Sequence, residues 1–104
     1  MIDILSLEER EIMKGFKGRF IHTKYMTIAF WVIKKGSVLP SHSHPHEQTT
    51  QVLEGKFELV VEDEKKICEK GFLTIIPPYT IHSGVALTDC KIVDVFSPVR
   101  EDYK

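Results

Sequence analysis

From Phe20 onward, the chain consists of short runs of β-branched and aromatic residues that are separated by turn-forming residues. The runs most typical of strands are Tyr25 to Ile33, Gln51 to Leu53, Lys56 to Glu62, Lys65 to Cys68, Leu73 to Ile76 and Lys91 to Phe96. Between them stand glycine, aspartate and lysine turns, and Pro77-Pro78 forms a rigid corner. About six to eight short strands at this spacing predict an all-β sandwich or barrel.

The segment before these runs has a different pattern. Ser6-Leu7-Glu8-Glu9 is a capping box, in which the serine hydroxyl and the glutamate carboxylate satisfy each other's amides. This signature predicts a short N-terminal helix that continues to about Met13 and ends before Gly15.

Length and charge limit the possible architectures and partners. A chain of 104 residues predicts a single domain, residues 1–104, with its barrel core at about residues 20–100. The formal charge is −1, and no basic block is longer than a pair, which argues against nucleic acid as a partner. No apolar run approaches the roughly 18 residues of a membrane helix, and no basic segment followed by an apolar one begins the chain. We therefore expect a cytoplasmic protein.

Histidine is the residue type with the most informative distribution. Three of the five histidines, His42, His44 and His46, lie within a stretch of five residues, and His82 lies far downstream. Residues i and i+2 of a strand share one face, so His42 and His44 can direct two imidazoles to one point. Gln48 has the same parity and offers an amide oxygen. Clustering of this kind predicts a metal site, although a surface histidine pair produces the same short pattern.

The spacing of the flanking glycines adds specificity. The first motif reads Gly36, five residues, His42-Ser43-His44, three residues, Gln48, six residues, Gly55. After 15 residues, the second motif reads Gly71, five residues, Pro77, four residues, His82. Together they resemble the two motifs of the cupins, and the resemblance covers about residues 25–100. Three positions depart from the family pattern: Gln48 replaces a glutamate, Tyr79 a glycine and Ala86 an asparagine.

The resemblance implies a double-stranded β-helix barrel of the jelly-roll kind with a metal near its mouth. It also implies that His42, His44, Gln48 and His82 are the metal ligands. Imidazole and amide ligands are compatible with a divalent transition metal such as Zn, Ni, Fe or Mn. Because none of these ligands carries a negative charge, the charge of the ion remains uncompensated, and we expect a small anionic substrate.

A second cluster lies near the C-terminal end. Alternation places Asp94 and Phe96 on one face of a strand, and a carboxylate inside a barrel is costly unless it is paired or used. The ending D-V-F-S-P-x-R-x-D-Y, with H-S-H-P-H-E-Q, resembles the small bacterial cupins that ketonise 4,5-unsaturated uronates in pectin and alginate breakdown. That resemblance implies that Asp94 transfers protons with help from Gln48, that Phe96 lines the pocket, and that Arg100 binds the substrate carboxylate.

Structural roles compete with these assignments. His46 fits either a pocket or a solvated turn, and Tyr79 either lines the entrance or caps the turn after the proline pair. The Asp94 carboxylate is also explained by an ion pair with Arg100 or Arg19 that closes the barrel end.

Three functions remain open for this fold and site. The preferred hypothesis is a metal-dependent isomerase that opens and tautomerises an unsaturated monouronate, working as a homodimer. A cupin dioxygenase is disfavoured because Gln48 removes the carboxylate that commonly completes such sites. A non-enzymatic sugar- or metabolite-binding cupin would use the same pocket without turnover.

Overall fold

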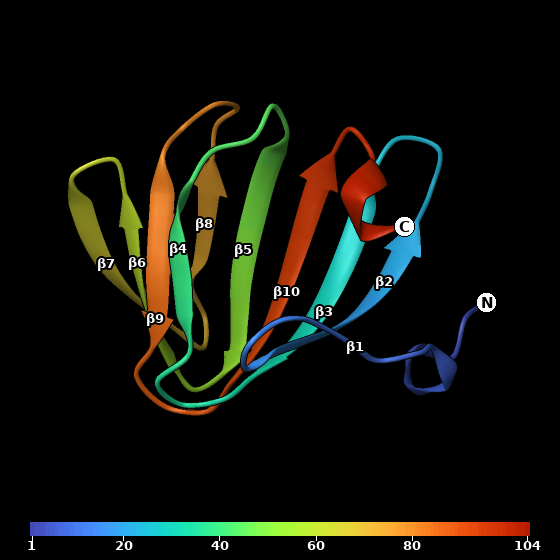
Figure 1. The fold of residues 1–104 in the computed structure, drawn as a ribbon, viewed down its shortest axis with the longest axis horizontal. Coiled ribbons are helices and arrows are strands. Elements are labelled where there is room, and N and C mark those ends of the chain that lie inside the picture. The colour runs from blue at the N-terminus through green and yellow to red at the C-terminus, as the bar shows by residue number, and fades with distance from the viewer.

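Ten strands form two antiparallel sheets that face each other, in a computed structural model that describes residues Met1–Lys104 (Figure 1). One sheet contains, in spatial order, β1 (Arg10–Met13), β2 (Phe16–His22), β3 (Thr27–Ile33), β10 (Cys90–Ser97), β5 (Glu47–Glu54) and β8 (Leu73–Ile76). The other contains β4 (Val38–His42), β9 (His82–Ala86), β6 (Lys56–Val61) and β7 (Glu64–Glu69). This arrangement confirms the predicted all-β jelly roll.

Each of the six predicted runs corresponds to a strand, and at most of them the boundaries are shifted by a few residues. Four further strands, β1, β2, β4 and β9, were not predicted. Their sequences contain residues that weaken the local strand signal: Gly18 in β2, Pro40 in β4 and Gly84 in β9. These strands are stabilised by their neighbours, because β2 pairs along its length with β3, and β9 lies between β4 and β6.

The predicted α-helix from Ser6 to Met13 is wrong. A single 3₁₀ turn, η1 (Ile4–Ser6), precedes this segment, and its cap is Asp3, whose carboxylate accepts from the Leu5 amide at 3.1 Å. Arg10–Met13 is β1, which pairs with β2 and packs Ile12 and Met13 against the core. Sheet pairing and apolar burial therefore outweighed the local capping signal.

The apolar core fills the space between the two sheets. Alternation is clear in β10, where Cys90, Ile92 and Phe96 are buried while Lys91 and Ser97 are exposed. The other buried apolar residues are Phe16, Ala29, Trp31, Ile33, Val52, Phe57, Leu59, Cys68, Ile76, Ala86 and Tyr103. Asp94 is also buried on the inward face of β10, as predicted from its parity with Phe96.

The glycines of the sequence motifs occupy turns with left-handed backbone geometry. Gly36, Gly55 and Gly71 have φ angles of 86°, 87° and 95°. At Gly55 a Cβ atom would also lie 2.1 Å from the carbonyl oxygen of Asp89, so the backbone there leaves no room for a side chain. Both constraints explain glycine at this position.

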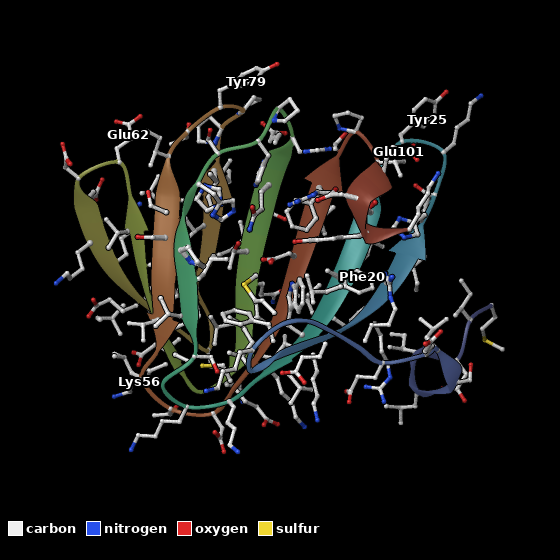
Figure 2. All side chains as sticks on the ribbon, in the orientation of Figure 1. Phe20, Tyr25, Lys56, Glu62, Tyr79 and Glu101 are labelled. Carbon is white, nitrogen blue, oxygen red and sulfur yellow. The ribbon has the colours of Figure 1, made fainter.

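The polar residues of the two motifs gather at one end of the barrel, the upper end in Figure 1. β4 and β8 end there, β5 and β9 begin there, and β10 runs toward it before the second 3₁₀ turn, η2 (Glu101–Tyr103). In Figure 2, Tyr79 marks the loop between β8 and β9 at this end, and Lys56 lies at the opposite end. Neither helical turn is long and apolar enough to cross a membrane.

Two neighbouring isoleucines of β8 provide a test of this packing. Ile76 is fully buried, while Ile75 is 61% exposed. We expect Ile76→Ala to lower the free energy of unfolding by about 2–5 kcal/mol, because it removes buried methyl groups and leaves a cavity. Ile75→Ala should change it by less than about 0.5 kcal/mol at protein concentrations low enough to keep the chain monomeric. Urea denaturation of both variants measures the difference, and equal losses would contradict the placement of β8.

Candidate metal centre

One cavity reaches from the upper end of the barrel into the core. Its polar wall consists of His42, His82, Gln48, Thr50, Asp94 and Arg100. Aromatic side chains complete the lining on the side of the six-stranded sheet, among them Trp31, Phe96 and Tyr103. Most of the residues that the sequence singled out for chemistry therefore share one space, although they come from four strands and the segment after β10.

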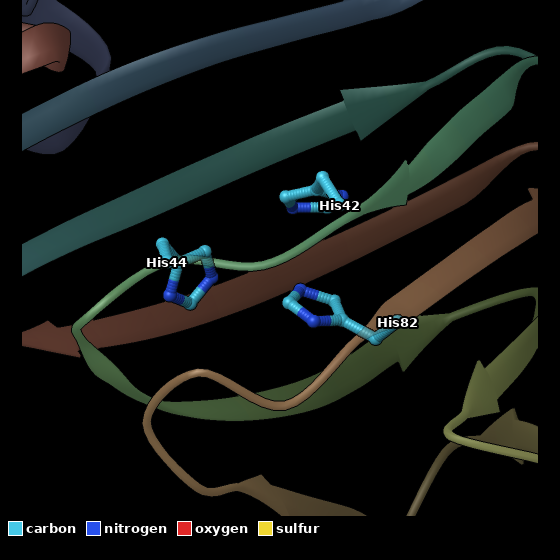
Figure 3. A group of neighbouring side chains, drawn as sticks. All are labelled: His42, His44 and His82. Atoms are coloured by element: carbon cyan, nitrogen blue, oxygen red, sulfur yellow. The ribbon is translucent and has the colours of Figure 1, made fainter.

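Three histidines converge beside this cavity (Figure 3). His42 and His82 are directly opposite each other in the pairing of β4 with β9, and their ring centroids are 4.2 Å apart. His44 lies beyond the end of β4, and its ring centroid is 5.0 Å from that of His82. One nitrogen from each imidazole lies within 4.8 Å of the others, so the three can hold one metal ion.

Hydrogen bonds to the backbone orient all three rings. The Nδ1 atom of His42 lies 2.8 Å from the Pro40 carbonyl, and that of His82 lies 2.9 Å from the Thr80 carbonyl. The Nδ1 atom of His44 lies 3.1 Å from the carbonyl of His46. Because a carbonyl only accepts, each Nδ1 carries the proton, and each Nε2 of a neutral ring keeps its lone pair for a ligand.

Two observations show that these residues fit a cation. The Nε2 atom of His82 is buried and has no hydrogen-bond partner. The Nε2 atom of His44 lies 3.0 Å from Oε1 of Gln48, and both atoms are acceptors in this tautomer. The Gln48 amide is held in this orientation because its Nε2 donates to the Thr50 hydroxyl at 2.9 Å. A positive ion shared by these acceptors would satisfy all of them.

The surroundings keep two of the imidazoles neutral. Burial lowers the pKa of His82 to about 4. Burial and the nearby Arg100 guanidinium hold the pKa of His44 below its ordinary value. A neutral ring is the form that coordinates a metal, so protons compete weakly for these positions near neutral pH.

Asp94 is the buried carboxylate of the cavity. Its Oδ2 accepts a hydrogen bond of 3.0 Å from the indole Nε1 of Trp31, while its Oδ1 has no partner. Burial raises the pKa of Asp94 to about 6, although the polar side chains of Thr50, Gln48 and Trp31 limit the increase. An acceptor oxygen thus remains available for a ligand in the same cavity as the histidines.

The two ion pairs considered for Asp94 do not form. Arg19 pairs with Glu9 at 3.0 Å, and Arg100 pairs with Asp102 at 2.6 Å. The Arg100 guanidinium also lies over the ring of Phe96, 4.8 Å from its centroid. Asp94 therefore has no ion-pair partner and accepts a hydrogen bond from the Trp31 indole, while Arg100 contributes a positive charge to the cavity wall.

Two candidate pocket residues have other positions than expected. The Tyr79 side chain is 72% exposed and does not line the cavity. Its backbone has a φ angle of 62°, the conformation that a glycine adopts easily, and its amide donates to the His44 carbonyl at 2.8 Å. His46 is half-buried beside Phe96, and its carbonyl orients His44, but it does not line the cavity.

Three cavity residues were not assigned a functional role from the sequence. Trp31 donates its indole N–H to Asp94. Thr50 and Tyr103 line the cavity as well. Thr50 could have been predicted from the sequence, because it is two residues from Gln48 and shares its face of the strand. Trp31 and Tyr103 reach the cavity through contacts that span most of the chain.

A double-sheet β-barrel with a candidate metal centre at one end defines the class of jelly-roll domains to which this chain belongs. Comparisons with known sequences and structures agree. The profile of the cupin domain family matches residues 29–96. The chain belongs to the cupin family.

Individual relatives give a narrower comparison. The chain is 35% identical over 71 residues to the pectin degradation protein KdgF of Dickeya dadantii, a match that spans 66% of this chain and 64% of that protein. The structure of KdgF from Halomonas sp. has a TM-score of 0.93 at 28% identity and covers 100% of this chain and 97% of that one. An RmlC-like cupin from Shewanella frigidimarina has a TM-score of 0.94 at 28% identity, with 100% and 95% covered.

Removal of a single imidazole tests the metal centre. We expect His82→Ala to weaken divalent-metal binding by more than about 100-fold, because changes to groups outside the ligand set already cost about 10–100-fold. Competition with a chelator of known affinity, followed by elemental analysis, measures the loss. His22→Ala is the matched control, since His22 contacts Thr27 and lies outside the cluster. Equal metal content in both variants would contradict the assignment.

Proposed function

We propose that this cupin catalyses the ketonisation of 4,5-unsaturated monouronates, the ring opening and tautomerisation that follow pectin or alginate cleavage. The observation that carries the proposal is the unpaired Oδ1 of Asp94, which shares one cavity with His42 and His82 of the histidine cluster and with Arg100. The similarity to proteins named for pectin degradation supports the same substrate class.

In this proposal, His42, His44, His82 and Gln48 hold one divalent metal. All four ligands are neutral, so the charge of the ion remains uncompensated within the site. A bound metal would supply Lewis acidity toward the oxygen that becomes negatively charged as the sugar ring opens. The identity of the metal, Zn, Ni, Fe or Mn, is a matter for elemental analysis.

The Arg100 guanidinium binds the carboxylate of the substrate. The guanidinium is planar and offers paired N–H groups, a geometry that a lysine cannot reproduce. Phe96 lies against this group and packs beside His44, with ring centroids 5.7 Å apart. The apolar ring excludes water between the guanidinium and the histidine cluster and orients the sugar between them.

Asp94 is the proton-transfer group of the proposed reaction. Its Oδ1 accepts the proton of the hemiacetal hydroxyl at C1 as the bond between C1 and the ring oxygen breaks. The electron pair of that bond remains on the ring oxygen, which stays attached to C5. Return of a proton to C4 converts the enol to the keto group, so the product is an isomer of the substrate. Gln48 assists by holding a water or the substrate oxygen beside the carboxylate.

The reaction is measured as the loss of ultraviolet absorbance of a freshly generated 4,5-unsaturated monouronate. We expect the metal-loaded protein to accelerate this loss above the spontaneous rate, and a chelator or His42→Ala to abolish the acceleration. Asp94→Asn should reduce the rate by about 100-fold or more, because it removes the proton-transfer group. Asp63→Asn, at the exposed turn between β6 and β7, should leave the rate unchanged.

Failure of acceleration by metal-loaded protein would contradict the proposal. Oxygen consumption in the presence of the same compound would then indicate a dioxygenase. Saturable binding of an unchanged uronate would indicate a non-enzymatic binding cupin.

We further propose that the protein works as a homodimer through the outer face of the six-stranded sheet. Two neighbouring rows of side chains cross this face in register. One row contains Ile75, Thr49, Val95 and Ile28, and the other contains Leu73, Gln51, Val93 and Phe30. Most of these side chains are apolar, and those on β8 are more than half exposed. An apolar sheet face of this kind favours association with a second copy.

A lysine placed on this face should prevent association. We expect Leu73→Lys to convert the dimer to a monomer at micromolar concentrations, because it buries a charge at the interface. Val38→Lys is the control, since Val38 is 59% exposed, close to the 56% of Leu73, but lies on the other sheet. Sedimentation equilibrium gives the masses, and a wild-type protein of 12.0 kDa would contradict the dimer.

A further inference from the structure

The Arg100 guanidinium packs against two aromatic rings. Its central carbon lies 4.8 Å from the ring centroid of Phe96 and 4.1 Å from that of Tyr103. Only 10% of the side chain is exposed. The two rings themselves pack edge to face, with centroids 5.8 Å apart, and the corner that they form limits the movement of the guanidinium.

One edge of the guanidinium is bound as well. Nε donates to Oδ1 of Asp102 at 3.0 Å, and Nη2 donates to Oδ2 of the same carboxylate at 2.6 Å. A guanidinium has five N–H groups, of which this side-on contact uses two. The remaining edge, formed by Nη1 and the second proton of Nη2, donates to no group of the protein, and it can bind a second carboxylate end-on.

Asp102 and Arg100 differ in their access to the cavity. The Asp102 side chain is 59% exposed, and it does not line the cavity, whereas Arg100 and Tyr103 do. Asp102 therefore holds Arg100 from outside the cavity and leaves the free edge to a ligand within it. The hydrogen bonds from Arg100 also lower the pKa of Asp102, so its carboxylate remains charged well below neutral pH.

The backbone of this segment is fixed at both ends. The amide of Arg100 donates to the Thr27 hydroxyl at 2.9 Å, and Thr27 is fully buried. The guanidinium of Arg10 donates to the carbonyl of Tyr103. These contacts tie the segment to β1 and β3, so its side chains start from a defined position.

We propose that Asp102 is a positioning residue that fixes the orientation of Arg100 for recognition of a ligand carboxylate. Asp102 itself does not touch the ligand. One guanidinium binds two carboxylates at once, side-on to Asp102 and end-on to the anion in the cavity. This preorganisation spares the ligand the entropy cost of ordering a long side chain. The choice of a uronate carboxylate rests on the proposed function.

The test compares Asp102→Asn with Asp102→Glu and with a neighbouring control. Glu101→Gln is the matched control, because Glu101 is exposed and pairs only with Lys104. We expect Asp102→Asn to raise KM for the unsaturated monouronate about tenfold with kcat within about twofold, since uniform binding is lost. The dissociation constant for D-galacturonate, measured by calorimetry, should rise by a similar factor. Asp102→Glu should restore most of both values, and metal content should stay at the wild-type level.

The Nε–H resonance of Arg100 in ¹⁵N nuclear magnetic resonance spectra provides a readout that does not depend on turnover. We expect a resolved, slowly exchanging signal in the wild type and in Glu101→Gln, and its loss in Asp102→Asn. An unchanged signal in Asp102→Asn, or an unchanged KM, would overturn the proposal. A fall in kcat at constant KM would also overturn it, because Asp102 would then act in the chemistry.

These outcomes separate the inference from the proposed function. If the wild-type protein neither ketonises the monouronate nor binds D-galacturonate, the uronate function fails. The Nε–H signal and its response to Asp102→Asn would still decide whether Asp102 orients Arg100. If Asp102→Asn does not fold, the same signal in Asp102→Glu decides the question, because a restored side-on contact must protect the Nε–H group.

Discussion

The candidate metal centre depends on the antiparallel pairing of β4 with β9. This pairing places His42 opposite His82 and brings their rings within 4.2 Å. Each ring is then turned by the same local device, a hydrogen bond from Nδ1 to the carbonyl two residues earlier. The Nε2 atom of His42 is therefore aimed by the backbone of β4, and that of His82 by the carbonyl of Thr80, just before β9. His44 completes the cluster from the short segment that leads into β5.

The interior of the barrel contains buried polar atoms that have no hydrogen-bond partner in the protein. The Nε2 of His82 and the Oδ1 of Asp94 are both buried without a partner, in a space otherwise lined mainly by apolar and aromatic groups. Buried groups of this kind destabilise a fold unless a ligand satisfies them. Their presence in one cavity supports the proposal that a ligand binds there. The hydrogen bond from Trp31 offsets part of this cost and fixes the carboxylate.

The segment from β10 to η2 supplies the second half of the site. Asp94 and Phe96 project from one face of the strand, and Arg100 follows where the chain turns back over the barrel end. Tyr103 then packs against Phe96 and closes the cavity on that side. One short stretch of chain thus supplies a carboxylate, an aromatic ring and a guanidinium, and it lies opposite the histidines of the other sheet. In the proposed function, Arg100 binds the substrate carboxylate on this side, and the histidines opposite hold the metal.

The sequence alone determined the all-β class, because strand alternation and left-handed glycine turns are local properties of the backbone. It also determined which side chains point inward in β10, and the motif spacing singled out His42, His44 and His82 before their proximity was known. The tertiary structure decided what depends on distant contacts. Arg10–Met13, predicted as part of a helix, became an edge strand because β2 offered a free edge. The partner of Asp94 is an indole 63 residues away, and Tyr79 turned outward although its backbone braces His44. Such outcomes follow from the closure of two sheets, which no local window of sequence contains.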